Sequence, residues 1–290
     1  MPRGAHDPHD TSRISPTAHY TGAVWLRNGL SHPALGTREG ALLYRASDRL
    51  IRAVAQLTRG PTLEQMLLAR HRIIDQLLVD AIERDGVAQV VEIAGGLSAR
   101  GLRFVRRYPG LRYVEGDLPG MVKRKRAALE RIGEPLAGHT VATLNALEDD
   151  GPRSLAAVAG PLLDKARPTA IITEGLLNYF SREQVLAMLA RFARFLAGFP
   201  GGVYLADLHL DAETLRHLGA RMFVPVLQWI ARGKIHLHFT DDAEAAAAIA
   251  AQGFDQVTLH RPKDWASRVA APKPRGPDVV RILEARVGAR

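Results

Sequence analysis

Between residues 87 and 210, short runs of apolar and β-branched residues alternate with longer amphipathic segments. The predicted strands of this region are 89–94, 111–115, 141–144, 169–173 and 203–207. Amphipathic helices are predicted between them, at 99–108, 119–132 and 181–196. Strands that are separated by helices indicate a parallel sheet with right-handed crossovers. We therefore expect a doubly wound α/β fold.

Two further strands are predicted near the C-terminus, at 254–259 and 279–287, and only a segment rich in proline and glycine joins them. Because no helix separates them, they indicate an antiparallel hairpin at the edge of the sheet. The alanine-rich run 243–251 before them fits a helix that ends at Gly253. The expected sheet has seven strands, and 290 residues suffice for one such large unit.

The residues before the sheet divide into three parts. Residues 1–13 are polar and are expected to form a disordered tail, and short apolar groups between glycines at 14–60 indicate a helical cap. A long helix is predicted next, with Thr62 as its N-cap, Gln65 completing a capping box, and an apolar stripe that stops at Gly86. We expect one domain over 14–290, with the cap and lead-in helix at 14–86 and the core at 87–290.

Arg70 interrupts the apolar stripe of this long helix at a position where the helical spacing predicts another apolar residue. A guanidinium on a buried face needs an anionic partner. Two partners are consistent with the sequence. One is an anionic ligand, and the other is a core carboxylate such as that of Asp75 or Glu64.

Composition excludes several kinds of chemistry. The chain has no cysteine, so disulfides, cysteine-bound metals and thiolate nucleophiles are ruled out. The net charge of +9 suggests a nucleic-acid partner, but most basic residues are arginines scattered over the whole chain. The densest run, Lys123 to Arg126, falls within a predicted helix and is expected to be solvated. Nucleic acid is therefore an unlikely partner.

Targeting and membrane elements are not predicted. The first thirteen residues lack the apolar stretch of a secretion signal. No uncharged apolar stretch approaches the roughly 20 residues that span a bilayer. We expect a cytoplasmic protein without a membrane partner, and a homodimer stays open.

Three acidic residues lie at the carboxyl ends of predicted strands, where ligands of a doubly wound sheet bind. Glu92 lies beside the Gly95-Gly96 turn, Glu115 ends the second strand, and Glu174 follows the fourth. Glu115 follows the glycine turn by the spacing at which nucleoside sites place an acid for ribose hydroxyls. The turn does not satisfy the full glycine fingerprint of dinucleotide sites, which counts against a nicotinamide-dependent dehydrogenase.

Five segments in order resemble class I S-adenosylmethionine-dependent methyltransferases, in particular the leucine carboxyl methyltransferase family and its bacterial polyketide O-methyltransferase members. They are SPTA (15–18), RHRIID (70–75), QVVEIAGGLSAR (89–100), YVEGDLP (113–119) with Lys125 following, and TEGLLNY (173–179). The resemblance implies a Rossmann-like methyltransferase sheet and S-adenosyl-L-methionine as the cofactor.

The resemblance also implies roles for single residues. Arg70 would bind the methionine carboxylate of the cofactor, Gly96 would let the backbone approach it, and Glu174 would face its amino group. Glu115 or Asp117 would hold the ribose hydroxyls, and Asn145 falls where the family has an aspartate near the adenine. Glu92 and Gly95 complete the predicted cofactor site.

This chain departs from the family pattern at three positions: Ala94 replaces glycine, Ser98 replaces aspartate, and Asn145 replaces a carboxylate. Alanine at the turn costs little if its backbone is not at positive φ. Lost carboxylates would weaken cofactor binding. A protein that binds the cofactor but has altered or lost chemistry therefore stays an alternative.

Methyl transfer relies mainly on positioning, and a general base is needed only for a neutral hydroxyl acceptor. Tyr20, Tyr179 and His209 are the candidate bases. No proline occurs between Glu174 and Phe180, whereas amine and nucleic-acid base methyltransferases often have an Asn/Asp-Pro-Pro-Tyr segment there, so an oxygen acceptor is favoured. No metal site is predicted, because a His236 and His238 pair has no evident third ligand.

The sequence thus predicts an enzyme that transfers a methyl group to a hydroxyl or carboxylate of a small metabolite. Four aromatic residues could line an apolar acceptor pocket: Trp25, Phe223, Trp229 and Phe239. An RNA-associated basic protein is the remaining alternative, and it predicts a steep salt dependence of RNA affinity.

Overall fold

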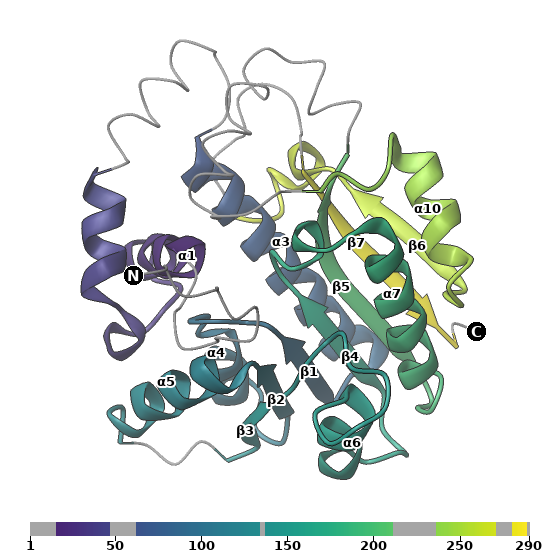
Figure 1. Cartoon of the computed structure of the whole chain (residues 1–290), viewed down its shortest axis with the longest axis horizontal. Coiled ribbons are helices and arrows are strands. Elements are labelled where there is room, and N and C mark those ends of the chain that lie inside the picture. Colours follow the sequence, from purple (N-terminus) through teal and green to yellow (C-terminus); the bar gives the residue numbers. More distant parts are fainter. Residues whose placement is uncertain (1–15, 47–61, 134–136, 211–235, 271–279, 289–290) are drawn as a thin grey trace, which may run out of the picture.

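The described residues form a seven-stranded mixed sheet with helices on both faces (Figure 1). A computed structural model describes residues 16–46, 62–133, 137–210, 236–270 and 280–288. The strands are β1 (Gln89–Ile93), β2 (Arg112–Asp117), β3 (His139–Thr143), β4 (Thr169–Thr173), β5 (Gly202–His209), β6 (Gln256–His260) and β7 (Val280–Val287). The predicted strands are all present. β2 and β5 extend two residues further than predicted and end at Asp117 and His209.

The strand order is β3-β2-β1-β4-β5-β7-β6. The pairs from β3 to β5 are parallel, whereas β7 pairs antiparallel with both β5 and β6. The chain leaves β1 towards β2 on one side and later returns to β4 on the other. The strand order therefore reverses between β1 and β4, where doubly wound sheets bind ligands. The predicted Rossmann-like α/β fold with a C-terminal antiparallel hairpin is confirmed.

Helices cover the sheet on both faces. α3 (Leu63–Asp85) and α4 (Arg100–Arg107) pack against one face together with η4 (Pro262–Trp265). α6 (Leu155–Ala159), α7 (Arg182–Leu196) and α10 (Asp242–Ala250) pack against the other. α5 (Pro119–Glu130) contacts β2 and β3. Figure 1 shows α7 and α10 in front of the sheet and α3 behind it.

The ends of α3 follow the capping rules. The Thr62 hydroxyl accepts a hydrogen bond from the Gln65 N–H, and the Gln65 side chain accepts one from the Thr62 N–H. Gly86 ends the helix at φ +72°, a left-handed conformation that glycine adopts without steric cost. Local sequence thus fixes where this helix begins and ends.

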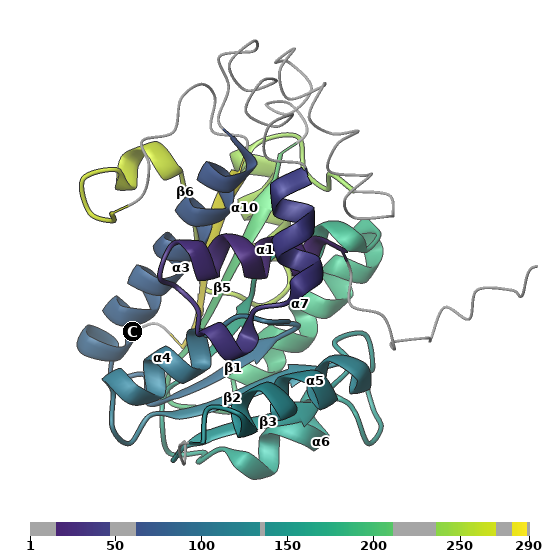
Figure 2. The same cartoon turned by 90° about the vertical axis from the view of Figure 1, so that its left-hand side faces the viewer.

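The N-terminal cap consists of α1 (Pro16–Arg27), η1 (Pro33–Leu35) and a helical segment over 38–46. Tyr20, Val24 and Tyr44 form a small core with the first turns of α3. α1 lies across the turn that follows β1 (Figure 2). A Cβ placed on Gly22 would lie 3.6 Å from the Leu97 side chain, and one placed on Gly96 would lie 3.9 Å from the Ala18 side chain. The predicted tail at 1–13 lies outside the described residues.

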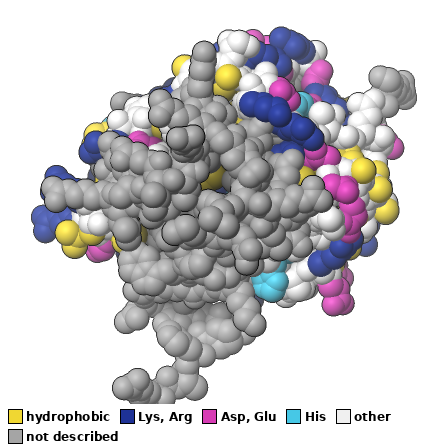
Figure 3. Space-filling view, turned by 90° about the horizontal axis from the view of Figure 1, so that it is seen from above, with side chains coloured by type: hydrophobic (Ala, Val, Ile, Leu, Met, Phe, Trp, Pro, Cys, Tyr) yellow, Lys and Arg dark blue, Asp and Glu magenta, His cyan; other side chains and the backbone are white. Residues whose placement is uncertain are grey.

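Charged side chains of both signs are interspersed among the described residues in the view from above (Figure 3). The prediction that the basic run of α5 is solvated is wrong for one of its residues. Lys125 is buried, and its ammonium contacts the Glu115 carboxylate at 2.5 Å. Among the described residues, none of the helices combines the length and apolar character that crossing a membrane requires.

Candidate active site

The turn after β1 brings the backbone of Gly96 to the end of β2. Gly96 adopts φ +57°, and its N–H donates to the Asp117 carboxylate at 3.0 Å. A side chain at Gly95 would press on the Glu92 carboxyl, 3.0 Å from a Cβ placed there. Both glycines therefore let the chain pass close over the strand ends, which is the approach that a bound nucleoside needs.

Ala94 adopts φ +56° at the first position of this turn. Alanine was expected to cost little here only if its φ were negative, so the observed positive φ means that alanine is strained at this position. An L-residue in the left-handed region costs roughly 1–2 kcal/mol. The Ala94 N–H donates to the Gly116 carbonyl at 2.7 Å, and this bond helps to hold the strained conformation.

Replacing Ala94 by glycine is expected to stabilise the protein by about 0.5–1 kcal/mol, because relief of the positive φ exceeds the extra entropy of glycine in the unfolded chain. Urea denaturation of the two proteins measures the difference. Gly86→Ala is the opposite control and should destabilise, since Gly86 has φ +72° and open space around it. A less stable Ala94→Gly protein would contradict the strain.

The two acids of β2 have different surroundings. Glu115 is buried, and its carboxylate contacts Lys125 Nζ at 2.5 Å and His139 Nε2 at 2.8 Å. Asp117 is half-buried at the strand end, where it accepts N–H bonds from Gly96 and Leu118. Burial raises the pKa of Asp117. Of the two candidates for the ribose, Asp117 is the last residue of β2, whereas Glu115 lies within the strand and is engaged by Lys125 and His139.

Arg70 is held by two carboxylates from the ends of neighbouring strands. Its Nε donates to Glu174 at 3.0 Å, and its Nη1 donates to Asp207 at 2.9 Å. Neither of the suggested core partners is used, since Asp75 pairs with other arginines and Glu64 accepts from Asn28 and Tyr44. The Arg70 guanidinium, which interrupts the apolar stripe, thus lies at the carboxyl ends of β4 and β5.

Asp207 was missed by sequence reasoning. It is buried in β5, and its second oxygen accepts the Gly175 N–H at 2.6 Å. Gly175 has φ +68°, and a Cβ there would lie 2.9 Å from Arg70 Nη2. The rule that selected Glu92, Glu115 and Glu174 could have found Asp207, since it ends the predicted fifth strand.

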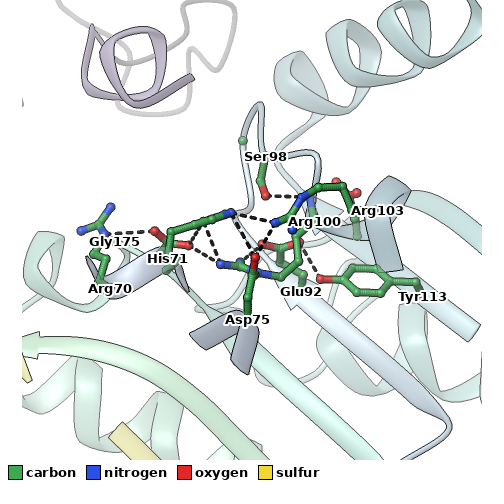
Figure 4. Close-up of polar contacts among 12 residues, drawn as sticks. Arg70, His71, Asp75, Glu92, Ser98, Arg100, Arg103, Tyr113 and Gly175 are labelled. Atoms are coloured by element: carbon green, nitrogen blue, oxygen red, sulfur yellow. Dashed lines mark hydrogen bonds and ion pairs between the residues drawn. The ribbon is translucent and has the colours of Figure 1, made fainter. Parts of the chain in front are cut away.

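A second ion network lies beneath the turn and is centred on Arg100 (Figure 4). Its guanidinium is fully buried and contacts Asp75 at 2.7 Å, Glu92 at 2.5 Å and Glu174 at 2.5 Å. Buried charges of this kind require full pairing. Arg100 is not among the site residues predicted from the sequence, because no local spacing connects it to carboxylates 8, 25 and 74 residues away.

Glu92 and Glu174 belong to this network. Glu92 accepts from Arg100 and, at 2.8 Å, from the Tyr113 hydroxyl, so it supports the turn from below. Glu174 contacts Arg70, Arg100 and, at 2.7 Å, His71 Nδ1. Both predicted cofactor residues are therefore already bound by donors of the protein.

The electrostatics of the network predict acid sensitivity. Burial alone would raise the pKa of Glu174, but His71, Arg100 and Arg70 outweigh it and hold the pKa well below its usual value of 4.5. Asp75 has a lowered pKa for the same reason, because His71 and the two arginines Arg100 and Arg103 oppose its burial. These ionised carboxylates contribute stability above their unfolded pKa values.

The free energy of unfolding is therefore expected to fall on acidification in two steps. It begins to fall below about pH 6.5, because His209 has a lowered pKa in the folded protein and takes up its proton on unfolding, and it falls more steeply below about pH 4.5, by about 1.4 kcal/mol per pH unit for each carboxylate protonated on unfolding. Asp117 has a raised pKa in the folded protein, so its protonation favours folding as the pH falls and partly offsets this loss of stability. Urea denaturation across the pH range measures the slope. Stability that rises on acidification from pH 5 to 4 would contradict the assignment.

Asn145 follows β3, and its side chain turns back to its own loop. Its Oδ1 accepts the Leu147 N–H at 3.1 Å, and its backbone N–H donates to the Arg153 carbonyl at 2.9 Å. The residue is half-buried. Its predicted contact with the adenine stays a prediction.

The three candidate bases occupy different places. Tyr20 is buried in the cap and stacks on Tyr44 at 5.7 Å between ring centroids. Tyr179, in η3 (Leu177–Tyr179), has 38% of its surface exposed, and its hydroxyl is within electrostatic reach of Arg70. His209 ends β5, two residues beyond Asp207.

His209 is oriented by Asn178. The Asn178 amide donates from Nδ2 to the His236 carbonyl at 2.7 Å, so its oxygen accepts from His209 Nδ1 at 3.0 Å. The proton of a neutral ring then lies on Nδ1, and Nε2 carries a lone pair. Burial lowers the pKa of His209 and Arg70 lowers it further, while Asp207 opposes them. A neutral imidazole of this kind is suited to accept a proton.

His236 and His238 stack with ring centroids 6.2 Å apart, and His238 Nε2 lies 3.0 Å from the Leu177 carbonyl. No group of three metal-ligating side chains occurs among the residues that the structure describes. Trp25 and Phe239 are buried, with the Trp25 ring 4.8 Å from that of His71. Phe223 and Trp229 lie outside the described residues.

Comparison with known proteins agrees with this geometry. The sequence model of the leucine carboxyl methyltransferase family matches residues 35–193, more than half of the chain. This range includes Arg70, the glycine turn, Asp117 and Glu174.

Two relatives are named as candidate S-adenosyl-L-methionine-dependent methyltransferases. The one from Mycolicibacterium paratuberculosis is 34% identical over 173 residues, which are 52% of this chain and 53% of the relative. The one from Mycolicibacterium smegmatis is 33% identical over 178 residues, 60% of this chain and 56% of the relative. The chain thus spans about half the length of the curated relatives it matches.

Solved structures share the fold over nearly the whole chain. A candidate methyltransferase from Thermobifida fusca has a TM-score of 0.62 at 15% identity, covering 98% of this chain and 100% of its own. A DUF574 family protein from Streptomyces avermitilis has a TM-score of 0.59 at 14% identity, covering 93% and 95%. The family match shows that the chain belongs to the leucine carboxyl methyltransferase family, and the solved structures share its fold.

Proposed function

We propose that the protein transfers a methyl group from S-adenosyl-L-methionine to a hydroxyl oxygen of a small molecule. The observation that carries the proposal is the cluster at the point where the strand order reverses. There, Arg70 is held beside Gly175, Gly96 approaches Asp117, and His209 ends the adjacent β5.

The residues present fit a nucleoside with an amino-acid tail. Asp117 offers a half-buried carboxylate to the ribose hydroxyls, which donate hydrogen bonds. The missing side chain of Gly175 makes room for the Arg70 guanidinium, whose Nη2 takes part in neither of its two ion pairs and could donate to a ligand carboxylate. Glu92 and Glu174 hold Arg100 and Arg70 in place, so we assign them mainly to positioning.

The bound cofactor would supply a methyl group activated by its sulfonium. The chain's own contribution is to orient the acceptor and to take up its proton. His209 Nε2 is the group that would accept the hydroxyl proton, while Nδ1 stays bonded to Asn178. A carboxylate acceptor would need no such base, so the oriented neutral histidine supports a hydroxyl acceptor.

Mass spectrometry of the ligand retained on purification tests the cofactor. S-adenosylmethionine or S-adenosylhomocysteine is the expected finding, and calorimetry should show stoichiometric binding of S-adenosylhomocysteine. A retained nicotinamide nucleotide, or no measurable affinity for S-adenosylhomocysteine, would contradict the proposal.

The role of His209 predicts a pH profile. Methyl transfer to a panel of phenols is expected to rise with pH through a pKa below 6.5 and then to level off. His209→Gln should remove this rise and slow transfer by about a hundredfold or more, without loss of S-adenosylhomocysteine affinity. His19→Gln is the control, because His19 bonds Thr37 in the cap. Faster transfer to benzoates than to phenols would favour ester formation instead.

A further inference from the structure

We propose that a second site, on the outer side of α3 and α4, binds the phosphoryl group of a small molecule. The site is a pocket of about 230 Å³ between α3, α4 and the residues that follow η4. Its polar lining is Arg72, Asp75, Gln76, Arg103, Arg107 and Arg268. We call it the arginine pocket.

Helix geometry places the arginine pocket on a different face of α3 from Arg70. Arg72 follows Arg70 by two residues, which turns its side chain by about 200° around α3. Arg72, Asp75, Gln76 and Val79 have the spacing of one helical face, and so do Arg103 and Arg107 on α4. The two faces meet at the pocket, while Arg70 points to the ends of β4 and β5.

The charges of the arginine pocket are incompletely paired. Arg103, Arg107 and Arg268 each contact one carboxylate, at 2.6 Å from Asp75, 3.2 Å from Glu83 and 3.0 Å from Asp80. Arg72 forms no ion pair with any residue that the structure describes. Four arginines thus line a pocket whose own lining contains one carboxylate.

A buried donor in the lining also lacks an acceptor. The Nε of Arg103 is shielded from solvent and has no hydrogen-bond partner among the described residues. Buried donors are almost always satisfied, because leaving one unpaired costs about 1–3 kcal/mol. An acceptor oxygen bound in the pocket would become its partner once the Arg103 side chain shifts to expose the Nε.

Charge and size together select the ligand. A phosphoryl group carries about 1.5 to 2 negative charges at neutral pH and three acceptor oxygens, which suit several guanidinium forks better than a single carboxylate does. The volume corresponds to roughly eight water molecules, so it admits phosphate, pyrophosphate or a small phosphate ester but not a nucleic-acid strand. Val79, Phe104 and Val269 give the remaining lining an apolar character that an ester could contact.

The test is calorimetric titration of the full-length protein with inorganic phosphate, pyrophosphate and glycerol 3-phosphate at low salt. Saturable binding with a dissociation constant of roughly 1 mM or below is expected for at least one of them. Comparison of the dissociation constants then shows whether the pocket prefers a free inorganic anion or a phosphate ester. Absence of saturable binding of all three up to roughly 10 mM would overturn the proposal.

Variants localise the binding. Arg72→Ala and Arg268→Ala should each weaken the affinity by about tenfold or more. Arg84→Ala removes an equal charge from an exposed position on the same helix and should change it less than about twofold. Equal weakening by Arg72→Ala and Arg84→Ala would show a general charge effect and overturn the site. Retained S-adenosylhomocysteine binding confirms that each variant is folded, and it separates failure of this site from failure of the proposed methyl transfer.

Discussion

Replacing Arg100 by alanine is expected to lower the free energy of unfolding by about 5 kcal/mol or more. Arg100 is fully buried and contacts the carboxylates of Asp75, Glu92 and Glu174. Glu92 and Glu174 have almost no exposed side-chain surface, so their charges cannot be solvated once the guanidinium is gone. Since domains of this kind have about 5–15 kcal/mol of stability, much of the chain should be unfolded at 37 °C.

Arg103→Ala is the matched control on the same helix. Arg103 keeps 30% of its side-chain surface exposed and contacts one carboxylate, that of Asp75, together with His71 Nε2 at 2.9 Å, so its loss should cost about 1–2 kcal/mol. Urea denaturation followed by far-ultraviolet circular dichroism measures both. Equal and small losses for the two variants would mean that the network does not hold the fold together.

Replacing Arg70 by alanine is expected to weaken S-adenosylhomocysteine binding by about 100-fold or more, because the cofactor carboxylate loses its charged partner. The stability should fall by less than for Arg100→Ala. Glu174 retains Arg100 and His71, and Asp207 retains the Gly175 N–H. Calorimetry of the folded variant measures the affinity.

Two further variants separate the role of Arg70 in binding from its role in folding. Arg70→Lys keeps a charge but loses the fork that reaches two carboxylates, so an intermediate loss of affinity is expected. Arg84→Ala, on an exposed turn of the same helix, should bind like the unchanged protein. Unchanged affinity in folded Arg70→Ala protein would remove Arg70 from the cofactor site.

Much of the fold could be predicted because its signals are local. Thr62, Gln65 and Gly86 fix the ends of α3, and Ser181 and Gln184 form the capping box of α7. The strand β4 has the predicted bounds, because all five of its residues are buried and form a continuous run. Such features depend on neighbours within a few residues, which the sequence itself contains.

The candidate site could be predicted only in part. The rule of acids at strand ends selected Glu174, but it could not say that Glu174 is shared by Arg70, His71 and Arg100. Those contacts join residues 74 to 104 positions apart, and they depend on how α3, α4 and β4 pack. The positive φ of Ala94 was likewise invisible, because alanine carries no signal for that conformation.

The place of β7 between β5 and β6 has a consequence for the order of assembly. During synthesis from the N-terminus, β5 emerges with one edge unpaired and stays so until residues 280–287 appear. β6 emerges earlier than β7, yet its only neighbour in the described sheet is β7. An open edge of eight residues is a template for pairing with other chains, so the nascent protein passes through its most aggregation-prone state just before the last strand closes the sheet.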